Sequence, residues 1–173
     1  MIRRFFPFAI AAAVFVLDRV TKLLIQTRVT AWDDRVVIPN FFNIVHAENR
    51  GAAFGLFSDS TGAVHNFLLI GLSLAVSAFI ATVLWRQRGG PLSRNWMLRA
   101  GLAFVLGGAL GNVYDRITAG TVTDFLEFYV GTHEFPSFNV ADSAITTGAG
   151  LLLLDMWRTR EKKPAAAEGR QKV

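Results

Sequence analysis

The sequence contains no cysteine, and its three histidines lie far apart at positions 46, 65 and 133. The absence of cysteine excludes disulfides, thiolate nucleophiles and cysteine-ligated metal sites. Neither an HExxH zinc-peptidase motif nor a GxSxG serine-hydrolase motif is present. We therefore expect no metal and no cofactor, and any hydrolytic chemistry has to come from other side chains.

Charged residues are also scarce. They make up 18% of the 173 positions, whereas 52% are hydrophobic and the mean hydropathy is +0.37. This composition is too apolar for an ordinary soluble domain and indicates a small multi-span membrane protein. Crossing a hydrocarbon core of about 30 Å takes about 20 residues per helix. The apolar segments that approach this length are 5–26, 65–85, 96–114 and 141–157.

These segments predict an all-α membrane protein with a small β element, in which four transmembrane helices form a bundle. We place the single membrane domain at residues 1–158 and a short, disordered basic tail at 159–173. The first segment follows Arg3 and Arg4 and resembles a secretory signal peptide. Charged residues follow it without a cleavage site, so we interpret it as an uncleaved first span.

The distribution of charge predicts the orientation of the helices. The N-terminus, the 86–99 loop and the C-terminal tail carry 12 Lys and Arg against 3 acids, whereas the opposite ends of the spans carry 6 against 10. The positive-inside rule therefore places both termini in the cytoplasm. Because the excess positive charge lies at that membrane face, the net charge of +5 does not indicate nucleic-acid binding.

The two segments on the outer side are 27–64 and 117–138, and the first of them is predicted to contain short strands and an interfacial loop. Val36–Ile38 and Phe41–His46 have the composition of short strands. Asn49–Phe57 combines polar and glycine residues with an aromatic, apolar patch, which favours a loop at the membrane surface.

Carboxylates gather where the third and fourth apolar segments approach this outer side. Asp115 and Arg116 end the third segment, Asp124 lies in a short alternating stretch, and Asp142 opens the fourth. Charged groups at such depths are costly and by default indicate function. The alternative is structural: Asp142 is stabilised at a helix N-terminus by the helix dipole, and Asp115 and Arg116 pair at a surface.

A further charged pair lies inside the first segment. Asp18 and Lys22 are four residues apart and share one face of a helix. They either neutralise each other near a helix end or support a polar site inside the bundle, and burial of the pair would favour the second interpretation.

Small residues predict close packing of the last two helices. The third segment carries Gly101, Gly107, Gly108 and Gly111, and the fourth carries Gly148. Small residues allow helix backbones to approach closely in lipid. We expect this packing to fix the positions of the carboxylate-bearing ends of these two helices relative to each other.

Five short motifs, taken together, resemble those of the lipoprotein signal peptidase family, also called signal peptidase II. They occur in the order of the family and span residues 18–142. They are DRVTK (18–22), NRGAAF (49–54), GNVYDR (111–116), VTDF (122–125) and FNVAD (138–142).

The resemblance implies a bacterial inner-membrane aspartic peptidase with four spans and a small periplasmic β-rich platform. Its substrates would be prolipoproteins whose lipobox cysteine carries diacylglycerol, cut just before that cysteine. We expect a monomer that contacts membrane lipid and no nucleic acid. The catalytic residues implied are Asp124 and Asp142. The supporting or substrate-binding residues implied are Asp18, Lys22, Asn49, Arg50, Gly51, Phe54, Asn112, Asp115, Arg116, Asn139 and Ala141.

Two carboxylates can perform this chemistry without help from a metal. When they lie a few ångströms apart they share one proton, so that one acts as a base on water and the other as an acid on the scissile carbonyl. Asn112 and Asn139 can orient the pair or hold substrate, or they can cap helices and satisfy loop amides.

The loop Asn49–Phe57 is expected to select lipidated substrate by closing over the peptide as a lid, with Gly51 and Gly55 as hinges. The alternative is a passive anchor whose aromatic residues seat the loop at the interface.

Two other functions remain open from sequence. A small ion-coupled transporter also places acids within a helix bundle, although transporters often show repeats between their halves. A non-enzymatic assembly or lipid-binding factor is the third possibility, with residues 41–57 as its interface.

Overall fold

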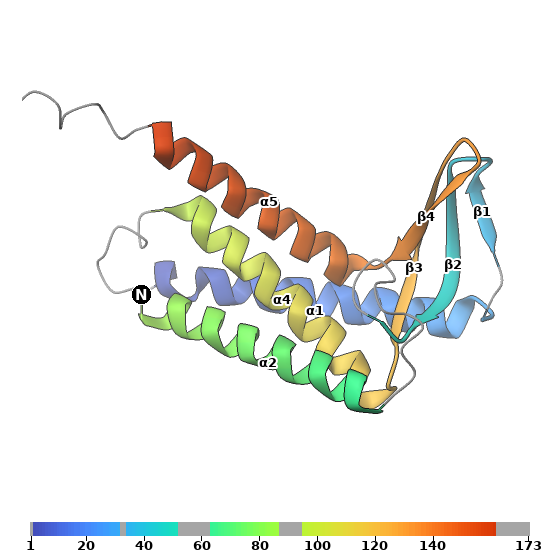
Figure 1. Ribbon diagram of the computed structural model, residues 1–173, viewed down its shortest axis with the longest axis horizontal. Coiled ribbons are helices and arrows are strands. Elements are labelled where there is room, and N and C mark those ends of the chain that lie inside the picture. The colour runs from blue at the N-terminus through green and yellow to red at the C-terminus, as the bar shows by residue number, and fades with distance from the viewer. Residues whose placement is uncertain (1, 32–33, 52–62, 87–94, 162–173) are drawn as a thin grey trace, which may run out of the picture.

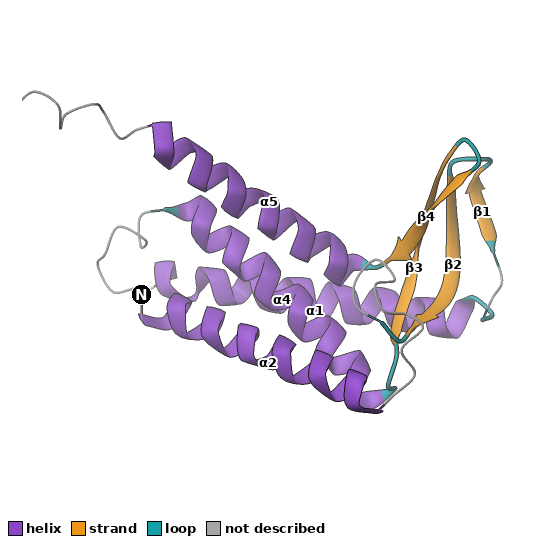
Figure 2. Cartoon of the chain, viewed as in Figure 1, coloured by secondary structure: helices purple, strands orange, loops and turns teal. Residues whose placement is uncertain are grey.

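The computed structural model describes residues 2–31, 34–51, 63–86 and 95–161. Within these residues, helices form an elongated bundle and strands form a sheet at one end of it (Figures 1 and 2). The elements are, in order, α1 (Ile2–Arg28), β1 (Arg35–Ile38), β2 (Phe42–Asn49), α2 (Ala63–Arg86), α4 (Trp96–Thr118), β3 (Val122–Val130), β4 (His133–Phe138) and α5 (Val140–Glu161).

The bundle is built around α4, which packs against α1, α2 and α5. Its contact with α5 depends on glycine. A Cβ atom added to Gly108 would lie 2.4 Å from the carbonyl oxygen of Ala141, and one added to Gly148 would lie 2.6 Å from the carbonyl oxygen of Gly101. The predicted close approach of these two helices is therefore confirmed.

Two helices of the described chain, residues 66–86 and 96–118, are long and apolar enough to cross a membrane. On α2, large apolar side chains such as Phe67, Leu72 and Phe79 are exposed, where lipid can cover them. The other two helices are less apolar because they carry charges, among them Asp18 and Lys22 on α1.

The helices extend beyond the predicted spans at several ends. α4 runs to Thr118, so Asp115 and Arg116 lie in its last turns instead of following the helix. α5 runs to Glu161, so the first three residues of the predicted tail are helical. The remainder of that tail, 162–173, lies outside the described residues.

The sheet is antiparallel throughout, with the strand order β1-β2-β3-β4. The two strands predicted between residues 36 and 46 are confirmed as β1 and β2. The stretch around Asp124 is β3, whereas β4 was not predicted. The turn between β1 and β2 contains Asn40 at φ 58°, and Gly131 takes φ 66° between β3 and β4.

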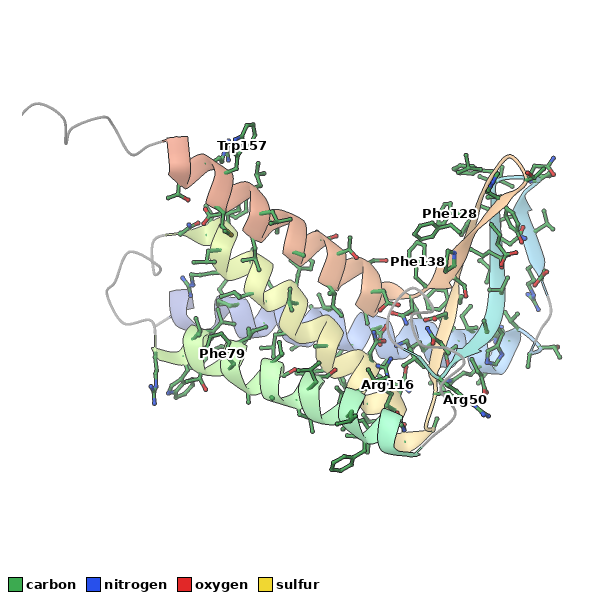
Figure 3. The ribbon with its side chains drawn as sticks, in the orientation of Figure 1. Arg50, Phe79, Arg116, Phe128, Phe138 and Trp157 are labelled. Carbon is green, nitrogen blue, oxygen red and sulfur yellow. The ribbon has the colours of Figure 1, made fainter. Side chains whose placement is uncertain are left out.

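Aromatic rings cover one side of the sheet. The rings of Phe42 and Phe128 stack with centroids 4.7 Å apart, and Phe128 stacks on Phe138 at 5.8 Å. Figure 3 shows Phe128 and Phe138 on the same side of the strands, toward the start of α5. This packing fixes β4 against β3, and β4 leads directly into α5 through Asn139.

Candidate active site

Asp124 lies on β3 at the junction of the sheet and the bundle, and its side chain is buried at 1% exposure. Its Oδ2 accepts a hydrogen bond from Asn49 at 2.9 Å, and its Oδ1 accepts one from Asn139 at 2.7 Å. Burial, together with the negative charge of Asp142, raises the pKa of Asp124 to about 7, although both hydrogen bonds oppose the shift. This carboxyl group can therefore hold or release a proton near neutral pH.

Asp142 lies in the first turn of α5 and is also buried. Its carboxylate accepts a hydrogen bond from the side-chain amide of Asn112 at 2.8 Å. Its backbone N–H donates to the side-chain oxygen of Asn139 at 2.9 Å. The positive end of the helix dipole lies at this position and favours a negative charge there.

Asn139 connects the two aspartates. Its side-chain oxygen caps α5 by accepting the amide of Asp142, while its side-chain nitrogen donates to Asp124. The same nitrogen also donates to the side-chain oxygen of Asn112 at 3.3 Å. The side-chain nitrogen of Asn112 in turn donates to the carboxylate of Asp142. Capping a helix and orienting the aspartates, which the sequence presented as alternatives for Asn139, are thus performed together by one side chain.

Lys22 lies at the centre of a buried charge cluster, which Asn112 connects to Asp142. Its ammonium contacts Asp18 at 2.9 Å, Asp115 at 2.7 Å and the side-chain oxygen of Asn112 at 2.9 Å. Both Asp18 and Lys22 are fully buried. The three partners satisfy the three donors of the ammonium. This burial favours a support for a polar site over a neutralising pair at a helix end.

The second oxygen of Asp18 reaches α5. It accepts the backbone amide of Ala141 at 2.9 Å. Ala141 is itself fully buried, and its side chain faces Gly111 of α4. α1 therefore holds the start of α5, where Asp142 lies.

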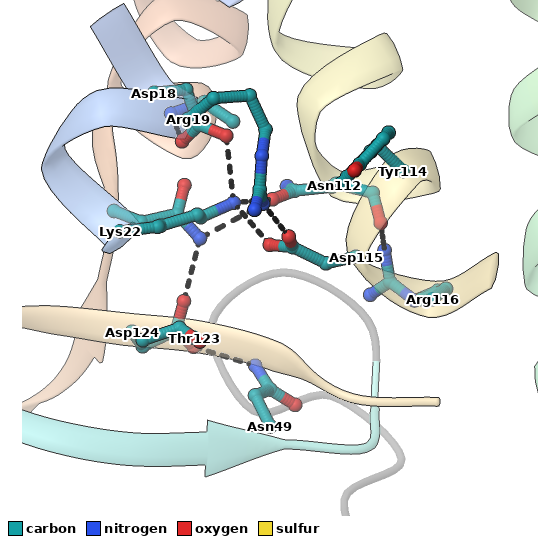
Figure 4. A network of polar contacts seen from close by, with 12 residues as sticks. Asp18, Arg19, Lys22, Asn49, Asn112, Tyr114, Asp115, Arg116, Thr123 and Asp124 are labelled. Carbon is teal, nitrogen blue, oxygen red and sulfur yellow. Dashed lines mark hydrogen bonds and ion pairs between the residues drawn. The ribbon is translucent and has the colours of Figure 1, made fainter. Parts of the chain in front are cut away.

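Arg116 connects the bundle to the segment that follows β2. Its guanidinium donates to the carbonyl oxygen of Gly51 at 2.6 Å and to that of Asn112 at 3.4 Å. The amide of Gly51 in turn donates to the side chain of Asn49 at 2.8 Å, and Asn49 binds Asp124. Figure 4 shows the bonds of Arg116 to Asn112 and of Asn49 to Asp124, next to the contacts of Lys22.

Most of the residues proposed from the sequence thus lie in one network. Arg50 lies beside it with an exposed side chain. Phe54 and the rest of the predicted lid, 52–57, lie outside the described residues, so the lid stays a prediction.

Sequence reasoning missed two residues at the edge of this network. Arg19 forms an ion pair with Asp115, and its guanidinium carbon lies 4.4 Å from the centre of the Tyr114 ring. Gln26 donates to the hydroxyl of Thr123, next to Asp124, at 2.7 Å. A signal for Arg19 was available, because three charges within five residues of an apolar helix require partners.

The described residues contain no group of three or more histidine, aspartate or glutamate side chains placed to hold a metal ion. The titratable side chains of the network are aspartates, one lysine and arginines. Such a set can exchange protons and orient a peptide, but it offers no redox centre.

Comparisons with known proteins identify the family to which the chain is similar. A family described as signal peptidase (SPase) II matches residues 10–158. A lipoprotein signal peptidase from Solibacter usitatus is 45% identical over 159 residues, which cover 92% of this chain and 94% of that protein. One from Alteromonas mediterranea is 42% identical over 154 residues, covering 89% and 81%.

A solved structure resembles the whole fold. It is described as a bacterial membrane enzyme determined by the in meso method at 2.3 Å resolution. It superposes with a TM-score of 0.79 at 28% sequence identity, covering 96% of this chain and 93% of the other. The arrangement of helices and sheet is therefore shared with a bacterial membrane protein.

Proposed function

The chain belongs to the signal peptidase II family, and from this premise we propose how its residues perform the reaction. It is an aspartic peptidase that removes the signal peptides of prolipoproteins. Neither the transporter nor the assembly-factor alternative has support among these relatives.

Asp124 and Asp142, hereafter the aspartate pair, are the catalytic residues of this proposal. The observation that carries it is the connection of two buried carboxyl groups through Asn139, with the pKa of Asp124 raised to about 7. Two close carboxyl groups in such surroundings share one proton. One of them is then a base while the other is an acid.

The reaction uses both forms of the aspartate pair. The ionised carboxylate takes a proton from water, whose oxygen attacks the scissile carbonyl carbon, while the protonated carboxyl hydrogen-bonds to the carbonyl oxygen. In the second step the tetrahedral intermediate collapses, the C–N bond breaks, and a carboxyl group gives its proton to the leaving amine. The pair ends with one proton, as it began.

The surrounding network holds the aspartate pair in position. Asn139 and Asn112 each contact a member of the pair, and Lys22 holds Asn112. A shift of about 1 Å in reacting groups costs about a hundredfold in rate, so fixed orientation is worth several kcal/mol. These three residues are therefore positioning residues.

The substrate in this proposal is a prolipoprotein whose lipobox cysteine carries diacylglycerol, cut just before that cysteine. Acyl chains anchor the cysteine in the outer half of the bilayer, so its scissile bond lies near the membrane interface. Asp124 lies on β3 and Asp142 in the first turn of α5, where the sheet meets the helices, and this placement supports a cut near the interface.

The membrane arrangement that fits this chemistry has four spans, both termini in the cytoplasm and the sheet on the outer side. The support is the charge asymmetry, 12 Lys and Arg against 3 acids at one set of helix ends. Single cysteines can be introduced into this Cys-free chain at Arg28 and Arg158 and labelled with an impermeant reagent. Labelling at position 28 alone in intact cells supports this topology, and labelling at 158 alone overturns it.

The decisive experiment supplies purified protein in detergent with a synthetic diacylglyceryl prolipoprotein peptide. Mass spectrometry should find a single cut, on the amino side of the lipidated cysteine. The same peptide without the diacylglyceryl group should be cut far more slowly. Absence of cleavage of the lipidated peptide, or a cut at another bond, would contradict the proposal.

A further inference from the structure

A pocket of about 310 Å³ lies beside Asp124, among residues of the sheet. Every described residue that lines it belongs to β2, β3 or β4 or directly follows β2. The polar ones include Glu48, Arg50, Asp124, Glu134 and Ser137. The pocket therefore borders the proposed catalytic residue Asp124, and its described walls come from the sheet.

The direction of the substrate chain decides which part of the substrate meets this pocket. A signal peptide is apolar and precedes the scissile bond, so it belongs beside the helices, in lipid. The mature part follows the scissile bond and leaves the membrane over the sheet. The pocket next to Asp124 thus meets residues on the carboxyl side of the cut.

Strand geometry narrows the choice to one position. In an extended peptide, successive side chains point in opposite directions and residues are spaced by about 3.3 Å. If the acyl chains of the cysteine point into the membrane, the next side chain points away from it, toward the sheet. That side chain lies within about two residue lengths of the scissile bond, so it can reach a pocket that Asp124 lines.

The charge of the pocket indicates what it accepts. Glu48 and Glu134 are exposed carboxylates at its wall, and the buried Asp124 also lines it. Arg50 opposes them from the segment after β2. With three acids and one base, the pocket attracts cations and hydrogen-bond donors and repels carboxylates.

We propose that this pocket binds the side chain of the residue that follows the lipidated cysteine, and that Glu48 and Glu134 make it favour a cationic or hydrogen-bond-donating side chain over an acidic one. The inference rests on the proposed peptidase function and names a specificity element within it.

The test uses three diacylglyceryl peptides that differ only in the residue after the cysteine, which is lysine, serine or glutamate. With wild-type enzyme, kcat/KM should decrease in that order, with about a three- to tenfold ratio between the lysine and glutamate peptides, the range expected for exposed charge pairs. Raising the salt to about 1 M should reduce the ratio, because the charges are in contact with solvent.

The double variant Glu48→Gln/Glu134→Gln should bring the ratio close to one. The matched control is Asp155→Asn, which removes an acid of α5 that does not line the pocket, and it should keep the wild-type ratio. A ratio that persists in the double variant would overturn the inference, as would an equal loss in Asp155→Asn.

The outcome also separates the two proposals. Cleavage of all three peptides by the wild type at equal kcat/KM would overturn the specificity inference and leave the peptidase function standing. Cleavage of none would overturn the peptidase function, and the inference with it.

Discussion

Asp18 and Ala141 are 123 positions apart in the chain, yet the carboxylate of Asp18 accepts a 2.9 Å hydrogen bond from the backbone amide of Ala141. The other oxygen of the same carboxylate contacts the ammonium of Lys22 at 2.9 Å. A single buried side chain of α1 therefore connects the charge cluster to the first turn of α5. The position of Asp142 therefore depends on an ion pair that lies outside the aspartate pair.

Replacing Lys22 should destabilise the protein strongly. Lys22→Met leaves the carboxylates of Asp18 and Asp115 buried without the ammonium between them, which costs about 3–5 kcal/mol. Thermal unfolding in detergent measures the effect, and Arg28→Met, at an exposed arginine of α1, is the control with little change. Adding Asp18→Asn to Lys22→Met should recover part of the loss. A wild-type melting temperature for Lys22→Met would show that the cluster contributes nothing to stability.

Replacing either aspartate of the pair should abolish cleavage while leaving the fold intact. Asp124→Asn and Asp142→Asn each remove the proton exchange and keep the side-chain shape, so kcat should fall by about 10⁴-fold or more. The double variant should be no worse than either single one, because the two groups act as a unit. Normal turnover by Asp124→Asn, with Asp34→Asn as the unaffected control, would refute the assignment.

Activity should fall as the pH rises above neutrality. The pKa of Asp124 is raised to about 7 by burial and by the charge of Asp142, so the shared proton is lost above that pH. Without it the pair has no acid, and kcat/KM should drop by about tenfold per pH unit on the alkaline side. Measurement from pH 5 to 9 with the serine peptide checks this. A profile that stays flat to pH 9 would contradict it.

The same carboxyl group should make stability depend on pH. The pKa of Asp124 is higher in the folded protein than in the unfolded chain, so the folded state binds more protons between pH 4 and 7. The stabilisation of the folded state by the protonated carboxyl group of Asp124 is fully present below pH 4. It is lost as the pH rises through 7, which lowers the free energy of unfolding by up to about 4 kcal/mol. When the pH is raised from 4 to 7, the melting temperature of Asp124→Asn should therefore fall less than that of the wild type.

A methyl group at Gly108 should impair both folding and catalysis. It would lie 2.4 Å from the carbonyl oxygen of Ala141, one residue before Asp142, so α5 has to move away. Gly150→Ala is the matched control, because its Cβ would meet nothing within 4 Å. We expect at least a tenfold loss of kcat/KM for Gly108→Ala, since a displacement of about 1 Å costs this much or more. Equal activities of the two variants would contradict a role for the close contact.

Much of the site was predictable because charge in an apolar chain is conspicuous. Asp18 and Lys22 stand four residues apart within hydrocarbon, and Asp115, Asp124 and Asp142 stand at the ends of apolar runs. The two strands around Pro39 were recognisable from β-branched and aromatic residues between turn residues. Each of these signals comes from a short stretch of the chain, so it can be recognised in a single sequence without a structure.

The unpredicted parts depend on contacts between distant segments. β4 has the sequence HEFPSF, which contains a proline and lacks alternation, and it becomes a strand because Phe138 stacks on Phe128 of β3. The bridge that Asn139 makes between the two aspartates needs the relative placement of β3 and α5. The ion pair of Arg19 with Asp115 likewise joins α1 to α4, so the sequence of α1 indicates that Arg19 needs a partner but not that the partner is Asp115.

The origin of the network in both early and late segments of the chain bears on how the enzyme is made. A nascent chain that has emerged only as far as β3 carries Lys22, Asn112 and Asp124, but it lacks Asn139 and Asp142, which come last. Chains are synthesised from the N-terminus and earlier segments fold first. A chain still being threaded into the bilayer therefore holds one aspartate without its partner, and under the proposed catalytic assignment it should not cut its membrane neighbours before α5 is in place.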